Sequence, residues 1–247
     1  MNGYQHDPIV PFKDSAEGKK KQVEQMFDRI ALKYDFLNRF LSARIDILWR
    51  KKAINILRKD APHTILDVAT GTGDVAIMTY KMLKTDKIIG IDISEGMIHV
   101  GREKVKKLGY EDHIDLLKGD SETINYSDNS FDAVTVAFGV RNFENLEKGL
   151  AEIKRVLKPG CKVVILEFSK PSGGIFKVFY SFYMDIITPL FVKLFSKNHL
   201  AYVYLNESVK KFPEGKNFIS ILNNLGFKET SFKKLTLGIC CIYCGEK

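Results

Sequence analysis

The sequence predicts an α/β fold built on a doubly wound, mostly parallel sheet, and three observations support this prediction. Apolar runs of strand length alternate with helical patterns, an order that produces right-handed crossovers between parallel strands. The first run leads into a glycine-rich turn, and acidic residues stand at or near the ends of the first three runs. The predicted strands are residues 64–68, 87–92, 113–118, 131–137 and 162–168.

The turn after the first strand is predicted to bind a ligand. Gly71 and Gly73 permit positive φ and a close approach of the backbone to a bound molecule. The helix predicted from Asp74 to Leu83 would direct its N-terminal amides into the same crevice, which favours an anionic or acceptor group on the ligand.

Two ligand classes fit this turn. Gly71, Gly73 and Ala76 match a loose dinucleotide fingerprint, and Asp92 follows about 20 residues later, where it could accept from ribose hydroxyls. Asp67, just ahead of the glycines, would repel a pyrophosphate and suits a ligand with positive charge. S-adenosylmethionine has a ribose, a sulfonium and no phosphate. A helix N-cap turn without a ligand is the remaining alternative.

Two further strand ends carry candidate site residues. Asp120 and Ser121 follow the third strand, where they could meet an adenine amino group and ring nitrogens, although acidic residues at strand exits are also common turn formers. Arg141 and Asn142 follow the fourth strand. The switch point of an open parallel sheet lies between its first and fourth strands, so both side chains are predicted to face the crevice. The alternatives are a solvated arginine and a helix-capping asparagine.

The N-terminal part is predicted to be an arm followed by a helical lid. Residues 1–22 contain Pro8 and Pro11 and read as a mobile arm ahead of a single domain at 23–247. Apolar residues recur at helical spacing within 23–60, once from Val23 to Tyr34 and again from Ile45 to Leu57. These two helices could cover the crevice as a lid or pack as an ordinary extension.

The C-terminal part departs from the strand and helix alternation. A hydrophobic insertion is predicted at residues 173–212, with apolar pairs every four residues up to 197. It could pack on the core, line a hydrophobic substrate site or press on a membrane. A last helix at 214–225 precedes two closing strands, 227–232 and 239–244, which have no helix between them and should pair antiparallel.

Composition limits the function classes. The chain has 247 residues, 45% of them hydrophobic, and a net charge of +8 spread along its length, which argues against a nucleic-acid partner. Without a signal peptide or an apolar run of about 18 residues, the sequence indicates a cytoplasmic protein and leaves open a peripheral contact with the inner face of a membrane. On a strand, Cys240 and Cys244 would face opposite to Cys241, so we expect structural thiols and no metal.

Five motifs resemble the C-methyltransferases of menaquinone and ubiquinone biosynthesis. The Phe-Gly-Val-Arg-Asn and Leu-Glu-Phe-Ser-Lys-Pro runs are the more specific ones. The likeness extends from about Val23 to the C-terminus, although Arg44 and Asp46 stand where many members carry Gly and His. The motifs are residues 66–74, 92–97, 138–142, 155–160 and 166–171.

The resemblance implies a class I methyltransferase with a seven-stranded sheet, an antiparallel last strand and a helical cap. It also implies S-adenosylmethionine as the methyl donor, bound by Thr72, Asp92, Asp120 and Ser121, and an isoprenoid quinol, most simply demethylmenaquinol, methylated on a ring carbon. We hypothesise that Arg141 and Asn142 stabilise the quinol anion, with Tyr34 orienting the ring.

Alternatives to this activity remain at this stage. They are a ubiquinone precursor or another lipophilic acceptor, a nicotinamide-dependent quinone reductase, and a lipid carrier without a cofactor. The headgroup of the quinol, the length of its isoprenoid chain, the general base and a homodimeric state are left open by the sequence.

Overall fold

The computed structural model describes residues 4–171, 173 and 199–247, without the side chains of 199, 200 and 202. Its centre is a seven-stranded sheet in the order β3-β2-β1-β4-β5-β7-β6. β7 runs antiparallel to both neighbours, and the other pairings are parallel, so the predicted fold class is confirmed. The strands are β1 Thr64–Val68, β2 Lys87–Asp92, β3 Ile114–Lys118, β4 Phe131–Ala137, β5 Leu157–Phe168, β6 Lys228–Leu235 and β7 Cys240–Glu246.

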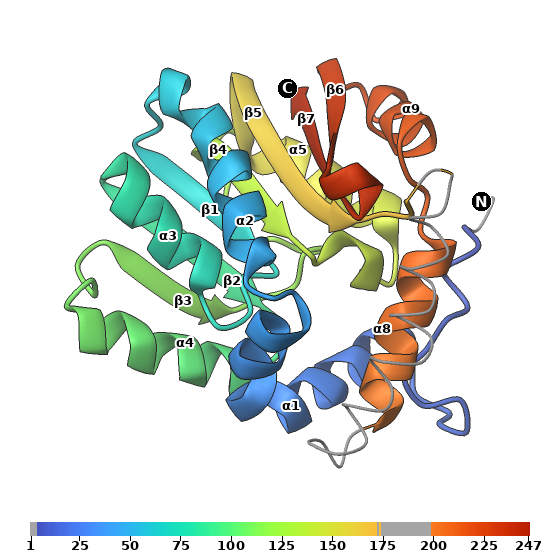
Figure 1. Cartoon of the computed structure of the whole chain (residues 1–247). Coiled ribbons are helices and arrows are strands. Elements are labelled where there is room, and N and C mark those ends of the chain that lie inside the picture. The colour runs from blue at the N-terminus through green and yellow to red at the C-terminus, as the bar shows by residue number, and fades with distance from the viewer. Residues whose placement is uncertain (1–3, 172, 174–198) are drawn as a thin grey trace.

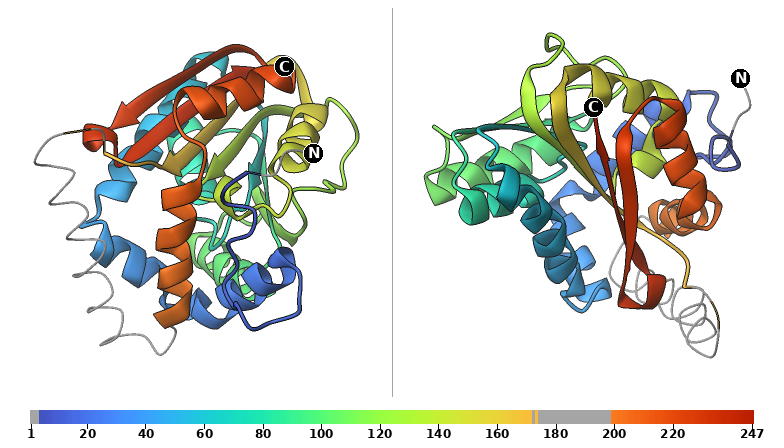
Figure 2. Two further views of the ribbon diagram at one scale, coloured as in Figure 1. Left: turned by 90° about the vertical axis from the view of Figure 1, so that its right-hand side faces the viewer. Right: turned by 90° about the horizontal axis from the view of Figure 1, so that it is seen from above.

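Helices cover both faces of the sheet (Figures 1 and 2). On one face α2 (Ile45–Ile56), α3 (Asp74–Leu83) and α4 (Glu95–Leu108) bury an apolar cluster, and on the other face α5 (Leu146–Val156) and α9 (Lys216–Asn224) bury a second cluster. The remaining elements are α1 (Lys19–Leu41), α8 (His199–Lys211) and the short 3-10 helices η1 (Leu57–Asp60), η2 (Val140–Asn142) and η4 (Thr236–Gly238).

Local sequence signals set several of these boundaries. The Ser94 hydroxyl accepts from the Met97 amide at the start of α4, and Gly109 ends that helix in the left-handed region, φ +67°. β5 begins at Leu157, five residues before the predicted start. The strand accommodates Pro159 and Gly160 because its pairing with β4 shifts register there, as a β-bulge allows.

The N-terminal arm ends earlier than predicted, and its described residues pack on the domain. α1 begins at Lys19, so residues 19–22 belong to the helix. His6 is fully buried, and its ring meets Phe212 edge-to-face with centroids 5.2 Å apart. The amide of Phe12 donates to the Gln22 side chain at 2.8 Å. These contacts pack the described residues of the arm on the domain, and the mobility expected for the arm remains a prediction.

Two further predictions concern the C-terminal half. The apolar segment predicted at 173–197 falls almost entirely outside the described residues. The cysteine prediction is confirmed in its geometry, since Cys241 joins one apolar cluster while Cys240 and Cys244 join the other. All four cysteines are free thiols. Among the described residues no helix could cross a membrane, and no group of three or more His, Cys, Asp or Glu could hold a metal ion.

Candidate active site

A cavity of about 660 Å³, counting the part of its mouth that is open to solvent, lies at the carboxyl ends of the central strands. α1 runs past these strand ends and forms one wall (Figure 1). The described residues around the cavity combine apolar rings with a few polar groups. They are Lys20, Val23, Phe27, Tyr34, Ala69, Gly71, Ile91, Asp92, Ile93, Met97, Gly119, Asp120, Ser121, Glu122, Ala137, Phe138, Gly139, Asn142, Phe143 and Glu144.

Asp92 and Gly71 form the most ordered polar part of this wall. The two oxygens of Asp92 accept from the amides of Gly71 and Ser94, each at 2.9 Å. Gly71 has φ +58°, and a Cβ built on it would meet no atom within 4 Å, so the backbone here is open to a ligand. Burial raises the pKa of the Asp92 carboxyl to about 6, against backbone hydrogen bonds that lower it.

Asp67 and Gly73 lie behind the cavity and shape the turn. Asp67 is 1% exposed and accepts from the hydroxyls of Thr70 and Thr135, each at 2.6 Å. Gly73 has φ +74°, in the left-handed region that favours glycine, and a Cβ on it would lie 2.9 Å from a terminal methyl of Leu116 in β3. Neither residue lines the cavity, and the donor-binding roles predicted for them remain predictions.

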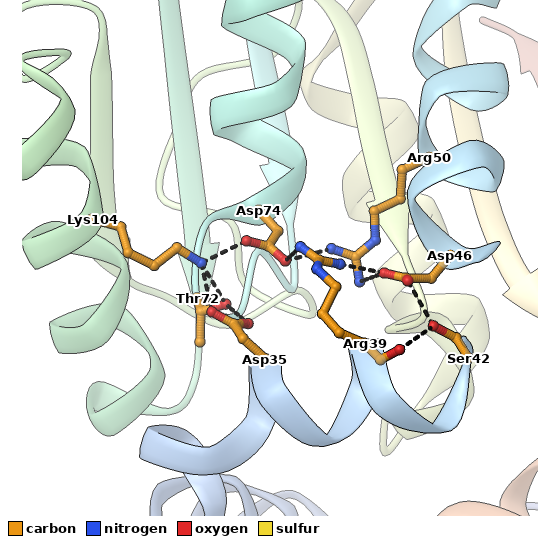
Figure 3. Close-up of polar contacts among 8 residues, drawn as sticks. All are labelled: Asp35, Arg39, Ser42, Asp46, Arg50, Thr72, Asp74 and Lys104. Carbon is orange, nitrogen blue, oxygen red and sulfur yellow. Dashed lines mark hydrogen bonds and ion pairs between the residues drawn. The ribbon is translucent and has the colours of Figure 1, made fainter. Parts of the chain in front are cut away.

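Thr72 is not among the residues that line the cavity, and its side chain lies in a polar cluster with residues of α1, α3 and α4 (Figure 3). Its hydroxyl donates to Asp35 of α1 at 2.6 Å. The ammonium of Lys104 in α4 bridges Asp35 at 2.8 Å, Thr72 at 3.1 Å and Asp74 at 2.6 Å. The Thr72 side chain therefore ties the glycine turn to α1 and α4. If Thr72 contacts S-adenosylmethionine as predicted, it would do so through its backbone.

The same cluster continues toward α2. Arg50 donates to Asp74 at 2.9 Å, and Arg39 of α1 donates to Asp74 and to Asp46. Asp46 also accepts from the Ser42 hydroxyl at 2.7 Å. Asp46 is thus an ion-pair partner that closes the turn between α1 and α2. This network fixes the C-terminal half of α1 relative to the N-terminus of α3.

Asp120 lines the cavity and is paired with a lysine of α1. Lys20 Nζ lies 2.7 Å from Asp120 and 3.1 Å from Glu122, and the other oxygen of Glu122 accepts from the Asn145 amide. Ser121 also lines the cavity. Asp120, for which an adenine contact is predicted, is therefore held by an ion pair that joins the N-terminal turn of α1 to the loop after β3.

Replacing Lys20 with methionine should lower the free energy of unfolding by about 1–2 kcal/mol, because Glu122 is 4% exposed and would lose its cation. The adjacent Lys21 is 55% exposed and pairs with Glu24 within α1, so Lys21→Met should change stability by less than about 0.5 kcal/mol. Urea unfolding followed by circular dichroism measures both. Equal losses in the two variants would contradict the role given to Lys20.

Asn142 and Tyr34 line the cavity, whereas Arg141 does not. Arg141 is 4% exposed, and its Nη1 donates to Glu167 of β5 and to the Phe138 carbonyl, each at 2.6 Å. Its Nε is buried without a hydrogen-bond partner among the described residues. Asn142 accepts from the Tyr204 hydroxyl of α8 at 3.1 Å. The structure thus brings Asn142 to the wall and places Arg141 behind it.

Sequence reasoning missed several residues around the site, namely Lys20, Glu122, Glu144, Glu167 and Tyr204. Lys20 could have been found, since it shares a helical face with Val23, Phe27 and Tyr34, at steps of three, four and seven residues. Glu167 and Tyr204 act through contacts between elements distant in sequence, and no local pattern indicates such contacts.

Comparison with known proteins identifies the family. A profile of the ubiE/COQ5 methyltransferase family matches residues 15–247. The chain belongs to this family. A demethylmenaquinone methyltransferase of Bacteroides fragilis is 48% identical over 245 residues, which covers 99% of each chain. The ubiquinone/menaquinone biosynthesis C-methyltransferase UbiE of Geobacter sulfurreducens is 44% identical over 93% of this chain and 90% of its own. The resemblance to the C-methyltransferases of menaquinone and ubiquinone biosynthesis, inferred from the sequence motifs, is therefore confirmed.

Solved structures agree with the ubiE/COQ5 assignment at the level of the fold. A SAM-dependent methyltransferase of Thermotoga maritima has a TM-score of 0.64 at 18% identity and covers 91% of this chain and 99% of its own. A Haemonchus contortus phosphoethanolamine N-methyltransferase, solved with S-adenosyl-L-methionine, has a TM-score of 0.59 at 16% identity, over 80% of this chain and 52% of that one. These similarities confirm the class I methyltransferase fold.

Proposed function

We propose that this protein transfers a methyl group from S-adenosylmethionine to a ring carbon of a demethylated isoprenoid quinol, converting demethylmenaquinol to menaquinol. The observation that supports this most strongly is the 48% identity over 99% of the chain to a demethylmenaquinone methyltransferase. The cavity beside Gly71 and Asp92 supports the same function, because it lies at the edge of the sheet where ligands of such folds bind.

The residues of the cavity fit the proposed donor. Asp92 presents carboxylate oxygens that could accept from ribose hydroxyls, and the open backbone at Gly71 would allow close approach of the donor. Asp120 and Ser121 could contact the adenine. When bound, S-adenosylmethionine would supply an electrophilic methyl group on its sulfonium.

The acceptor chemistry requires little from the protein beyond geometry and charge stabilisation. Loss of a proton from a quinol hydroxyl to water places negative charge on the adjacent ring carbon. That carbon can then attack the methyl group in line, so that a C–C bond forms while the C–S bond breaks and the sulfur keeps the electron pair. The methylated carbon finally loses its hydrogen as a proton to water, which restores the aromatic ring. A hydrogen-bond donor near the quinol oxygen stabilises that anion. In this proposal the Asn142 amide is that hydrogen-bond donor and Tyr34 orients the quinol ring. The positive charge of Arg141 stabilises the quinol anion from behind the cavity wall.

Calorimetric titration tests the donor. S-adenosylhomocysteine should bind to the protein at about one equivalent, and NADH should not. Binding of NADH alone would instead support a nicotinamide-dependent quinone reductase, and binding of neither would support a lipid carrier. If S-adenosylhomocysteine binds, methyl transfer to demethylmenaquinol and to the corresponding ubiquinone precursor should be compared at equal concentrations.

The pH dependence of donor binding should report Asp92. Because its pKa is about 6, the carboxylate that accepts from the ribose is lost as the pH falls through that value, and the Kd for S-adenosylhomocysteine should rise about fourfold between about pH 7.5 and about pH 5.5. A raised carboxyl pKa means that the folded protein binds more protons than the unfolded chain, so this group does not weaken the fold as the pH falls. Asp92→Asn should bind weakly and lack this dependence. A pH-independent Kd in the wild type would contradict this role.

A peripheral membrane contact is also part of the proposal, since the acceptor is lipophilic. Leu32, Phe36 and Leu48, from α1 and α2, are 89%, 63% and 57% exposed. The exposed ionisable residues between positions 30 and 59 are all cations, including Lys33 and Arg44. Leu32 and Phe36 lie one turn apart on the same face of α1, and an exposed apolar pair next to cations suits an anionic bilayer.

Flotation with vesicles containing phosphatidylglycerol tests this contact. The wild type should float with the vesicles, and Leu32→Glu combined with Phe36→Glu should not. Unchanged flotation of that variant would exclude this surface. A concentration-dependent dimer that the same variant abolishes would indicate that a second copy of the chain covers it instead.

A further inference from the structure

Tyr204 approaches the site from behind the cavity wall. It lies in α8, is 2% exposed, and its hydroxyl is 3.1 Å from Oδ1 of Asn142, a residue 62 positions earlier in the chain. Asn142 lines the cavity, while Tyr204 is not among the described residues that do. We propose that Tyr204 is a positioning residue that fixes the direction of the Asn142 carboxamide. In this direction the Nδ2 amino group of Asn142 faces the quinol oxygen. This inference rests on the proposed function.

The direction of this carboxamide matters because its two ends have nearly the same shape and opposite polarity. The Nδ2 end donates hydrogen bonds, and the Oδ1 end only accepts them. A quinol oxygen that loses its proton is stabilised by an N–H and repelled by a carbonyl. Rotating the Asn142 carboxamide by 180° about its Cβ–Cγ bond exchanges Oδ1 and Nδ2, and would therefore replace a stabilising contact with a repulsive one.

Two contacts on the protein side select one direction. The Phe138 carbonyl can only accept, and it lies 3.5 Å from Nδ2 of Asn142, at the limit of a hydrogen bond. The Tyr204 hydroxyl supplies the shorter contact. Burial raises the pKa of Tyr204, so the hydroxyl keeps its proton and can donate to Oδ1. Without the hydroxyl, the long contact to Phe138 would be the only one among the described residues that distinguishes the two orientations.

Arg141 supports the same arrangement. Its Nη1 donates to the Phe138 carbonyl at 2.6 Å and to Glu167 at 2.6 Å, which fixes the carbonyl that faces Asn142. The cation is therefore engaged with protein acceptors on this side, while the neutral amide of Asn142 reaches the cavity wall.

A double-mutant cycle on methyl transfer tests the inference. With demethylmenaquinol carrying a short isoprenoid chain, Tyr204→Phe should lower kcat about tenfold and leave the Kd for S-adenosylhomocysteine unchanged. In an Asn142→Ala background the same substitution should cause no further loss, because Tyr204 acts through Asn142. Tyr243→Phe is the matched control. Tyr243 is fully buried, and its hydroxyl accepts from the Gly215 amide away from the cavity, so kcat should be unaffected.

A second readout does not depend on activity. In ¹⁵N-labelled protein, the side-chain amide resonance of Asn142, assigned by its loss in Asn142→Ala, should shift or broaden in Tyr204→Phe and stay in place in Tyr243→Phe. An unchanged resonance in folded Tyr204→Phe, or an equal loss of kcat in both backgrounds, would overturn the inference. If the wild type does not methylate the quinol, the proposed function fails, and the amide resonance still decides whether Tyr204 orients Asn142.

Discussion

Replacing Arg141 with alanine should lower the free energy of unfolding by about 3–5 kcal/mol. The reason is the environment of its partner. Arg141 is 4% exposed and Glu167 is fully buried, so the substitution leaves a carboxylate deep in the protein without the cation that stabilises it. Burial already raises the pKa of Glu167, and Arg141 is the main group that lowers it. Urea unfolding followed by circular dichroism measures the loss.

A surface arginine and a rescue variant make this result specific. Arg102 is 48% exposed and pairs with Glu95, so Arg102→Ala should cost less than about 1 kcal/mol. Arg141→Met combined with Glu167→Leu should recover much of the stability, since a buried pair can be replaced by apolar side chains of similar volume. A loss below about 1 kcal/mol in Arg141→Ala would mean that Glu167 is not stabilised by Arg141.

Asp92→Ala should weaken the binding of S-adenosylhomocysteine about 100-fold. The substitution removes the proposed acceptor for the ribose hydroxyls. It also removes the acceptor for the amides of Gly71 and Ser94, which hold the turn next to the cavity. The loss of the ribose contact and the loss of the contacts that hold the turn both weaken binding of the same ligand. Among the variants described here, we therefore expect Asp92→Ala to change the affinity for S-adenosylhomocysteine most. Isothermal titration calorimetry gives the Kd directly.

Asp86 provides the control for this experiment. It immediately precedes β2, at the end opposite to Asp92, is 75% exposed and pairs with His63. Asp86→Ala should change the Kd less than about twofold, because an exposed ion pair of this kind contributes little. Wild-type affinity in Asp92→Ala would remove Asp92 from the donor site.

Much of the fold could be predicted because local signals and the required topology agree. β4 matches the predicted range at both ends, since five of its seven residues are buried and it follows the turn-forming Asn129 and Ser130. The helix from Asp74 to Leu83 also matches, beginning after Gly73 and ending before Lys84 in the left-handed region. The carboxyl ends of parallel strands must meet at one edge, so the position of Asp92 beside Gly71 followed from topology.

The direction of side chains could not be predicted in the same way. Thr72 and Arg141 both occupy the predicted edge of the sheet, yet Thr72 contacts Asp35 and Lys104, and Arg141 contacts Glu167. These partners lie 26 to 37 residues away in the chain. Each orientation depends on how a separate element packs, and the periodicity of a single segment contains no information about that packing.

Methyl transfer itself tests the central claim most directly. The protein should be incubated with demethylmenaquinol and S-adenosylmethionine carrying a deuterated methyl group, and the products should be analysed by mass spectrometry. We predict menaquinol with one deuterated methyl on a ring carbon and an equal amount of S-adenosylhomocysteine. A folded protein that binds S-adenosylhomocysteine but leaves the quinol unmodified, or places the methyl on oxygen, would contradict the proposed function.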